Sequence, residues 1–280
     1  MSAFAPDAPH HIPGIPGIPR EPAPAAGAVL TLTGERTIPG LDIENYWFRR
    51  HEVVYQRLAP RCAGLEVLEA GCGEGYGADL IAAVARRVVA VDYDGAAVAH
   101  VRARYPAVEV LRANLTELPL PDASVDVVVN FQVIEHLWDQ ARFVAECARV
   151  LRPSGLLMVS TPNRITFSPG RETPVNPFHT RELNAAELTE LLIDGGFREV
   201  SISGLFHGPR LREMDARHGG SIIEAQIARA VADAPWTPGL AADVAAVTAD
   251  DFDIRESGGD PGDLDDLGDS LDLIAIAVRP

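Results

Sequence analysis

The residues with the clearest chemical potential form a glycine-rich segment that follows an apolar run. Glu69 precedes glycines at alternate positions, Gly71, Gly73 and Gly75. Glycine is required where a turn needs a positive φ or where a ligand approaches the backbone closely. A dinucleotide fingerprint would read Gly-x-Gly-x-x-Gly and hold a pyrophosphate, but position 76 is tyrosine and a carboxylate at Glu69 would repel phosphate. The pattern favours a nucleotide cofactor with a positive amino group; another nucleotide site or a packing turn are the alternatives.

A second carboxylate lies at the end of the next apolar run. Asp92 closes the run 88–92, about 20 residues beyond the glycines, where an acid can bind both hydroxyls of a ribose. We therefore predict a cofactor contact at Asp92, with Tyr93 beside it.

Two polar clusters follow later apolar runs. The first is 131–138, which contains the adjacent pair Glu135 and His136, and the second is 160–164 with its continuation 176–182, which contains His179. Histidine is the commonest general base, and a hydroxyl nucleophile must lose a proton. We predict catalytic roles for these three side chains, although helix capping and ion pairing would also explain them.

Short apolar runs alternate with amphipathic stretches, which is typical of βαβ units and a parallel sheet covered on both faces. The prediction is a doubly wound α/β fold whose seven-stranded, mostly parallel sheet ends in an antiparallel last strand. The expected strands are 66–70, 88–92, 108–112, 125–130, 156–160, 199–203 and 271–278. The expected helices are 43–58, 78–85, 96–104, 141–151 and 185–193.

Two segments do not fit this alternation. Residues 1–28 are rich in proline and glycine and have little apolar bulk, so we expect a disordered tail before one domain at 29–280. Residues 204–270 form a long insertion with a helix expected at 222–232. We expect this insertion to act as a lid over the substrate, with a flexible acidic tip near 258–269.

Composition narrows the function. The 280 residues carry a formal net charge of −16, which makes a nucleic acid a poor substrate because the surface repels phosphate. The three cysteines show no zinc-finger or disulfide spacing. Neither a secretory leader nor an apolar run of membrane-spanning length is present in the sequence, so we expect a cytoplasmic enzyme.

From about Leu65 to Val200 the chain resembles the class I S-adenosylmethionine (SAM)-dependent methyltransferases of type 11, whose first motif is an acid followed by Gly-x-Gly-x-Gly. The resemblance implies SAM as cofactor. It implies that Asn114 meets the adenine through its side chain and Leu115 through its backbone. It also implies that Asn130 and Gln132 flank the methionine part. The family more often has aspartate at position 114.

The pair Glu135–His136 resembles two arrangements in this family. In many sugar and small-molecule methyltransferases a histidine here lies near the acceptor hydroxyl. In ubiquinone-type and small-RNA 2′-O-methyltransferases, Glu-x-x-Glu-His and a later residue bind a divalent metal. This chain has Gln132 in place of the first glutamate, and His179 would be the later ligand. A magnesium site at Glu135, His136 and His179 therefore stands beside the catalytic-base interpretation.

The signatures 160–164 (Ser-Thr-Pro-Asn-Arg) and 176–179 (Asn-Pro-Phe-His) are similar to those of bacterial sugar methyltransferases. The segment 30–50 resembles the mycobacterial methyltransferases assigned to methylglucose lipopolysaccharide synthesis. The resemblance implies O-methylation of glucose units, at the 6-hydroxyl, in a small or oligosaccharide acceptor. The alternatives are a quinone or polyketide hydroxyl, or a SAM-binding regulator without catalysis.

Overall fold

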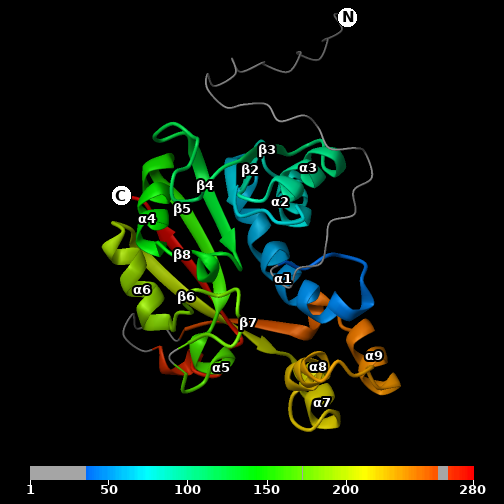
Figure 1. The fold of residues 1–280 in the computed structure, drawn as a ribbon. Coiled ribbons are helices and arrows are strands. Elements are labelled where there is room, and N and C mark those ends of the chain that lie inside the picture. The colour runs from blue at the N-terminus through cyan, green and yellow to red at the C-terminus, as the bar shows by residue number, and fades with distance from the viewer. Residues whose placement is uncertain (1–35, 172, 258–263) are drawn as a thin grey trace, which may run out of the picture.

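The computed structural model describes residues 36–171, 173–257 and 264–280. Among these residues, eight strands form one sheet in the order β3-β2-β1-β4-β5-β8-β6-β7 (Figure 1). The strands are β1 (Glu66–Ala70), β2 (Arg87–Asp92), β3 (Glu109–Arg112), β4 (Val125–Phe131), β5 (Leu151–Pro162), β6 (Arg198–His207), β7 (Phe252–Glu256) and β8 (Asp272–Val278).

The first five strands along the chain run parallel, and the strand order reverses between β1 and β4. Ligands of doubly wound sheets bind at such a reversal, outside the carboxyl ends of the strands. The last strand, β8, runs antiparallel between β5 and β6. The doubly wound, mostly parallel sheet with an antiparallel last strand is therefore confirmed.

The sheet has one strand more than the seven expected, because the insertion itself contributes β7. This strand pairs antiparallel with β6 at the edge of the sheet. Its segment, Phe-Asp-Ile-Arg-Glu, alternates in polarity and is only partly buried, so it lacks the continuous apolar run by which the buried strands were identified.

Helices cover both faces of the sheet. They are α1 (Asn45–Leu58), α2 (Tyr76–Ala82), α3 (Gly95–Arg104), α4 (Gln140–Val150), α5 (Arg164–Phe167), α6 (Ala185–Asp194), α7 (Pro209–Arg217), α8 (Ile222–Val231) and α9 (Pro238–Ala245). Short 3₁₀ helices are η1 (Asp42–Glu44), η2 (Ala59–Cys62), η3 (Ile134–His136), η4 (Ala249–Asp251) and η5 (Asp265–Leu267). All five expected helices are present, with shifted ends.

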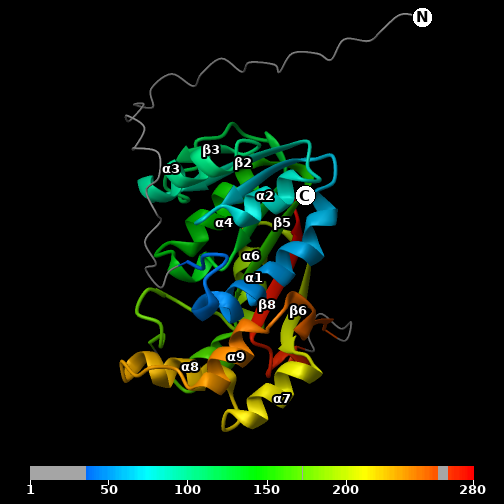
Figure 2. The same ribbon diagram turned by 90° about the vertical axis from the view of Figure 1, so that its right-hand side faces the viewer.

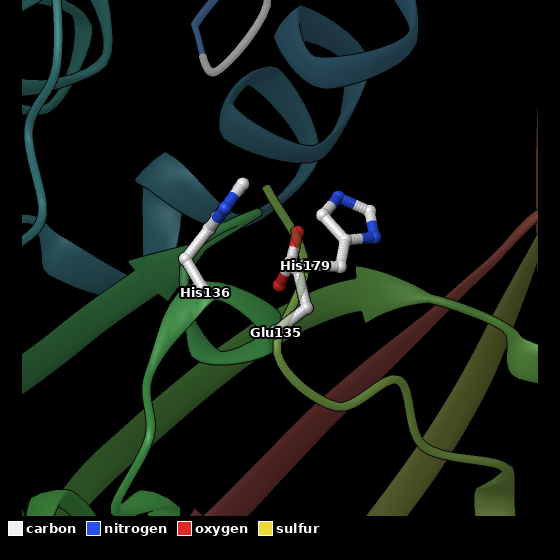
Figure 3. Close-up of side chains that lie close together, drawn as sticks. All are labelled: Glu135, His136 and His179. Atoms are coloured by element: carbon white, nitrogen blue, oxygen red, sulfur yellow. The ribbon is translucent and has the colours of Figure 1, made fainter. Parts of the chain in front are cut away.

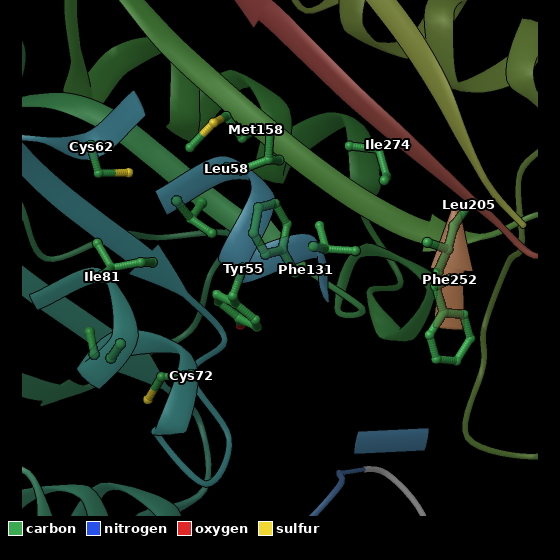
Figure 4. Close-up of a cluster of buried hydrophobic side chains, with 14 of the residues drawn as sticks. Tyr55, Leu58, Cys62, Cys72, Ile81, Phe131, Met158, Leu205, Phe252 and Ile274 are labelled. Carbon is green, nitrogen blue, oxygen red and sulfur yellow. The ribbon is translucent and has the colours of Figure 1, made fainter. Parts of the chain in front are cut away.

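Alternate residues of each central strand enter different cores. Val67 and Val127 pack with α1, α2 and α3 on one face, and Leu68 and Val128 pack with α4 and α6 on the other. Successive strand side chains point to opposite faces, so an apolar run of this kind must be buried on both. Figure 4 shows part of the first core, where Tyr55 of α1 lies near Phe131 at the end of β4.

The described part of the insertion is folded. Its helices α7, α8 and α9 lie together at one end of the molecule, beneath α1 in both views (Figures 1 and 2). Asn45 of α1 fixes this unit by donating from Nδ2 to the carbonyl oxygens of Val244 and Val247, both at 2.9 Å. The predicted tail 1–28 lies outside the described residues, as does the first half of the predicted acidic tip, 258–263. The second half is described and contains η5, in which Leu267 is buried, so this part is folded rather than flexible.

Throughout the described ranges, every helix is too short or too polar to cross a bilayer. The three cysteines are all unpaired and buried.

Candidate functional site

The glycine-rich turn connects the end of β1 to the start of α2. Gly71, Gly73 and Gly75 have φ values of 90°, 53° and 99°, a region that disfavours other residues. A Cβ on Gly71 would lie 2.6 Å from the side chain of Val133, and one on Gly75 would lie 2.6 Å from that of Val101. The turn is therefore tight for both conformational and packing reasons.

Asp92, at the end of β2, holds this turn in place. Its Oδ2 accepts a hydrogen bond from the backbone nitrogen of Gly73 at 2.8 Å, and its Oδ1 accepts one from the nitrogen of Asp94 at 2.9 Å. Burial raises the pKa of Asp92 above its ordinary value. A carboxylate has about four acceptor sites, so each oxygen can accept a further bond, as a ribose diol requires.

Glu69 is fully buried beneath the turn. Its Oε1 accepts a hydrogen bond from the hydroxyl of Tyr55 at 2.6 Å, while Oε2 is buried without a partner among the described residues. Burial raises the pKa of Glu69 to about 8. Asn130 is similar, because its Nδ2 donates to the carbonyl of Ala70 at 2.7 Å and its Oδ1 is buried without a partner there. Two unsatisfied buried oxygens suit a ligand with several N–H donors, such as an ammonium group.

A cavity of about 570 Å³ opens over the carboxyl ends of β1, β2 and β4. The predicted residues in its wall are Gly71, Gly73, Asp92, Tyr93, Asn114, Leu115, Gln132 and His136. Glu69, Gly75, Asn130, Glu135 and His179 lie outside this wall. The structure thus brings most of the predicted cofactor residues to one cavity and places the acidic residue of the glycine motif behind it.

Asn114 sits in this wall with its amide oxygen already engaged. Its Oδ1 accepts from both the backbone nitrogen and the hydroxyl of Thr116, each at 3.0 Å. An amide oxygen has two lone pairs, so both are used. The family resemblance implies that the side chain of Asn114 meets the adenine. To accept a hydrogen bond from the adenine amino group, Asn114 would have to change its side-chain conformation.

Several wall residues were not predicted as site residues, among them Arg36, Thr37, His51, Tyr55 and Tyr76. A signal for two of them was present, because His51 and Tyr55 are four residues apart in a predicted helix and hence on one face. Burial lowers the pKa of His51 to about 4, so its imidazole is neutral at pH 7.

The three predicted catalytic side chains lie close together, and His136 and His179 flank Glu135 (Figure 3). Glu135 and His136 belong to η3 and His179 comes from the loop before α6. One nitrogen or oxygen of each lies within 4.8 Å of the others. The Oε2 of Glu135 accepts from the hydroxyl of Thr161 at 3.0 Å, and burial raises the pKa of Glu135 to about 8.

Hydrogen bonds orient both imidazoles. His136 Nδ1 lies 3.0 Å from the carbonyl oxygen of Phe178, which can only accept, so Nδ1 carries the proton and Nε2 the lone pair. His179 Nδ1 is 2.6 Å from Oε1 of Glu182, and its Nε2 is 3.0 Å from the amide nitrogen of Asn176. The rings of His136 and His179 meet edge to face, 4.9 Å apart.

Glu135, His136 and His179 are also the residues of the predicted magnesium site. Magnesium prefers oxygen ligands in octahedral geometry, whereas this set offers two imidazole nitrogens and one carboxylate. Both ring nitrogens of His179 are also engaged by Glu182 and Asn176. A metal would have to displace Asn176, so the side chains as arranged fit magnesium poorly.

Comparison with known proteins agrees with the cavity geometry. Residues 68–159 match the family model described as a methyltransferase domain. The chain is 76% identical to a probable S-adenosylmethionine-dependent methyltransferase of Mycobacterium tuberculosis, over the full length of both. It belongs to the SAM-dependent methyltransferase family. A second relative in this family, from Mycolicibacterium smegmatis, is 73% identical and covers 93% of this chain and 99% of its own.

The methyltransferase also resembles more distant proteins. It is 35% identical over 105 residues to the ubiquinone biosynthesis O-methyltransferase of Rhizobium etli, which covers 36% of this chain and 42% of that protein. A possible histamine N-methyltransferase of Thermotoga maritima has a TM-score of 0.55 at 18% identity, covering 84% and 93% of the two chains. The [4+2]-cyclase SpnF has a TM-score of 0.51 at 22% identity, covering 81% and 80%. These two structures show the fold alone.

The family shown by the mycobacterial relatives makes this chain an enzyme that uses SAM.

Proposed function

We propose that this methyltransferase transfers the methyl group of SAM to a sugar hydroxyl, the 6-hydroxyl of glucose units in a precursor of a polymethylated polysaccharide. One observation carries the proposal: His136 lies in the wall of the cofactor cavity, and two exposed aromatic residues are close to it, Trp138 two residues along the chain and Phe178 through a hydrogen bond of its carbonyl oxygen. Trp138 is 92% exposed. Exposed aromatic side chains near a candidate base suit a pyranose ring, which has apolar faces and a hydroxyl rim.

The proposal gives each cofactor residue a role that its position in the structure supports. Asp92 accepts the two ribose hydroxyls, since each of its oxygens has a remaining lone pair. Asn114, Leu115 and Tyr93 surround the adenine. Glu69 and Asn130 carry unpartnered buried oxygens that would receive the ammonium group of the methionine part. The rest of the assigned set is Gly71, Gly73, Gly75 and Gln132.

His136 is the general base in this proposal. When bound, the cofactor supplies a methyl group activated by a sulfonium. Nε2 of His136 would accept the proton of the acceptor hydroxyl, and the bound cofactor would supply the methyl group by cleavage of its S–CH₃ bond and leave as a neutral thioether. The carbonyl oxygen of Phe178 accepts a hydrogen bond from Nδ1–H of His136 and would stabilise the imidazolium that forms. Glu135 and His179 act as positioning residues around it.

Aromatic and polar groups near His136 support a sugar acceptor. Phe178 is 42% exposed, and its carbonyl oxygen accepts a hydrogen bond from Nδ1 of His136. His51 and Gln132 add polar groups to the cavity wall. A hydroxyl-rich acceptor can satisfy such groups, whereas an apolar ring would leave them unpaired.

A quinone or polyketide hydroxyl is the second candidate. It is favoured by the partial similarity to a ubiquinone biosynthesis O-methyltransferase. A quinone needs a closed, mostly apolar pocket, whereas the wall of this cavity also contains the polar side chains of His51, Gln132 and His136. The insertion would close over an extended acceptor as a lid, although none of the residues that line the described cavity comes from it.

Incubation with labelled SAM and a panel of glucans, mannans, phenols and quinones tests the proposal. We expect methyl transfer to short α-glucans, located at the 6-position by mass spectrometry of the products. Transfer to a phenol or quinone with none to any glucan or mannan would overturn the sugar assignment. It would leave the family and the cofactor untouched.

A further inference from the structure

A second cavity, of about 330 Å³, lies next to the first. Thr180 joins them: it lines the second cavity, and its hydroxyl donates to the carbonyl oxygen of Leu137 at 2.7 Å. Leu137 lines the cofactor cavity. The walls of the two cavities therefore meet at the contact between Thr180 and Leu137.

Glu182 is the reason to expect a ligand in the second cavity. Its side chain is fully buried and belongs to the cavity wall. Its Oε1 accepts from Nδ1 of His179 at 2.6 Å, but Oε2 is buried without a partner among the described residues. A buried acceptor without a donor is unfavourable, so a ligand that brings a donor would stabilise this arrangement.

The charges of the wall select the kind of ligand. Arg164, Arg171 and Arg181 supply N–H donors, while Glu182 and Glu187 supply acceptors. Arg164 and Glu187 already form an ion pair at 3.1 Å. A phosphate or carboxylate only accepts hydrogen bonds and would be repelled by Glu182, whereas a hydroxyl both donates and accepts. The mixed wall therefore suits a neutral polyol.

The volume limits how much of a ligand fits. Small-molecule sites range from about 300 to 1,000 Å³, so a cavity of about 330 Å³ is at the lower end. This suits one sugar ring rather than a chain of several. Arg171 and Arg181 are exposed, so the wall is open to solvent on their side and a neighbouring sugar unit could continue outward.

We propose that this second cavity is an acceptor subsite, which binds the sugar unit next to the one that is methylated. The inference rests on the proposed sugar methyltransferase function. Glu182 connects the subsite to the reaction centre, because it orients His179, which contacts the ring of His136. The enzyme should therefore prefer an oligosaccharide to a single sugar, with the preference located in these arginines and Glu182.

The test uses the double variant Arg171→Ala/Arg181→Ala, with Arg198→Ala as matched control. Arg198 is an exposed arginine of β6 that lines neither cavity. Binding of maltotetraose is measured by calorimetry in the presence of S-adenosylhomocysteine, so the measurement does not depend on methyl transfer. We expect the double variant to bind maltotetraose at least about tenfold more weakly, the effect of losing a hydrogen bond to a charged group. The control should bind as the wild type does.

Turnover supplies a second readout. In the double variant, KM for maltotetraose should rise while kcat and the KM for methyl glucoside stay within about twofold. Wild-type affinity for maltotetraose in the double variant would overturn the subsite. Inorganic phosphate that binds the wild type and not the double variant, without any glucan binding, would also overturn it. Glucan binding that the double variant loses, without methyl transfer to any glucan, would support the subsite and contradict the proposed reaction.

Discussion

At the scale of single residues, we expect Glu69 to couple cofactor binding to the loss of a proton. Burial raises the pKa of Glu69 to about 8, so at pH 7 the side chain is mostly protonated. An ammonium group beside Oε2 favours the ionised form. We expect SAM binding at pH 7 to release protons, measured by titration calorimetry in buffers of different ionisation enthalpy.

The isosteric variant Glu69→Gln controls for this effect. It should release no proton and bind SAM about tenfold or more weakly, because a hydrogen bond to a charged group is lost. The pH dependence of the stability of the unbound protein gives a second test. The folded pKa of Glu69 lies above the unfolded value of 4.5, so the wild type loses stability as pH rises from about 4.5 through 8, and the variant should lose less. Equal proton release by the variant and the wild type would remove Glu69 from the cofactor site.

His136 makes the second prediction at this scale. His136→Ala should lower turnover by roughly 10²–10⁴, the range for loss of a general base, and leave SAM affinity unchanged. The matched control is His218→Ala, since His218 pairs with Asp243 in the insertion and lines neither cavity. If turnover with a verified acceptor is unchanged in His136→Ala, His51 becomes the next candidate, because it is neutral at pH 7 and lines the same cavity.

Treatment with a chelator distinguishes a catalytic base at His136 from a bound metal ion. Because both ring nitrogens of His179 are hydrogen-bonded within the protein, we expect the rate to be the same before and after treatment with EDTA. The measurement is the initial rate with a verified acceptor, followed by addition of magnesium, manganese or zinc. Loss of activity that one of these ions restores would favour the metal site at Glu135, His136 and His179.

At the scale of elements, the contact between α1 and α2 supports the cofactor turn. A Cβ on Gly77 of α2 would lie 2.2 Å from the ring of Tyr55, whose hydroxyl donates to Glu69. Gly77→Ala must therefore displace Tyr55. We expect about 1–3 kcal/mol of destabilisation, the usual effect of overpacking, measured by urea unfolding, together with weaker SAM binding.

Gly239 offers a matched control because it is likewise the second residue of its helix, α9. A Cβ there meets nothing within 4 Å. Since alanine favours a helix more than glycine does, Gly239→Ala should be neutral or slightly stabilising. If both variants unfold at the same urea concentration as the wild type, the packing of Tyr55 does not depend on Gly77.

At the scale of the whole molecule, one buried ion pair ties the N-terminal helix to the last strand. Arg50 of α1 donates from Nε and Nη2 to the two carboxylate oxygens of Asp272 of β8, at 2.7 and 2.6 Å. Both side chains are almost completely buried. Removal of one partner leaves the other charge buried and uncompensated, which costs about 3–5 kcal/mol.

We therefore expect Arg50→Met to lower the free energy of unfolding by that amount, and Arg50→Met/Asp272→Leu to recover part of it. Urea unfolding of the wild type, both single variants and the double variant gives the coupling energy. Additive effects of the two substitutions would show that the ion pair does not link these two elements energetically.

The sequence alone determined the parts of this protein that depend on near neighbours in the chain. The turn at Gly71, Gly73 and Gly75 was predictable because a positive φ restricts the residue type at its own position. The alternation of apolar runs and helices predicted the doubly wound sheet, since burial on both faces leaves a pattern in each strand. The position of Asp92 in the cavity wall was predictable because it ends the strand next to that turn.

Only the tertiary structure decided which distant side chains meet. The proximity of His179 to His136 was expected from the family resemblance, whereas the position of His51 in the cavity wall and the pair formed by Arg50 with Asp272 join segments far apart in the chain. Their proximity follows from how helices and loops pack on the sheet, and no local pattern records it. The edge strand β7 was missed for the same reason, because it is stabilised by pairing with β6 rather than by an apolar run of its own.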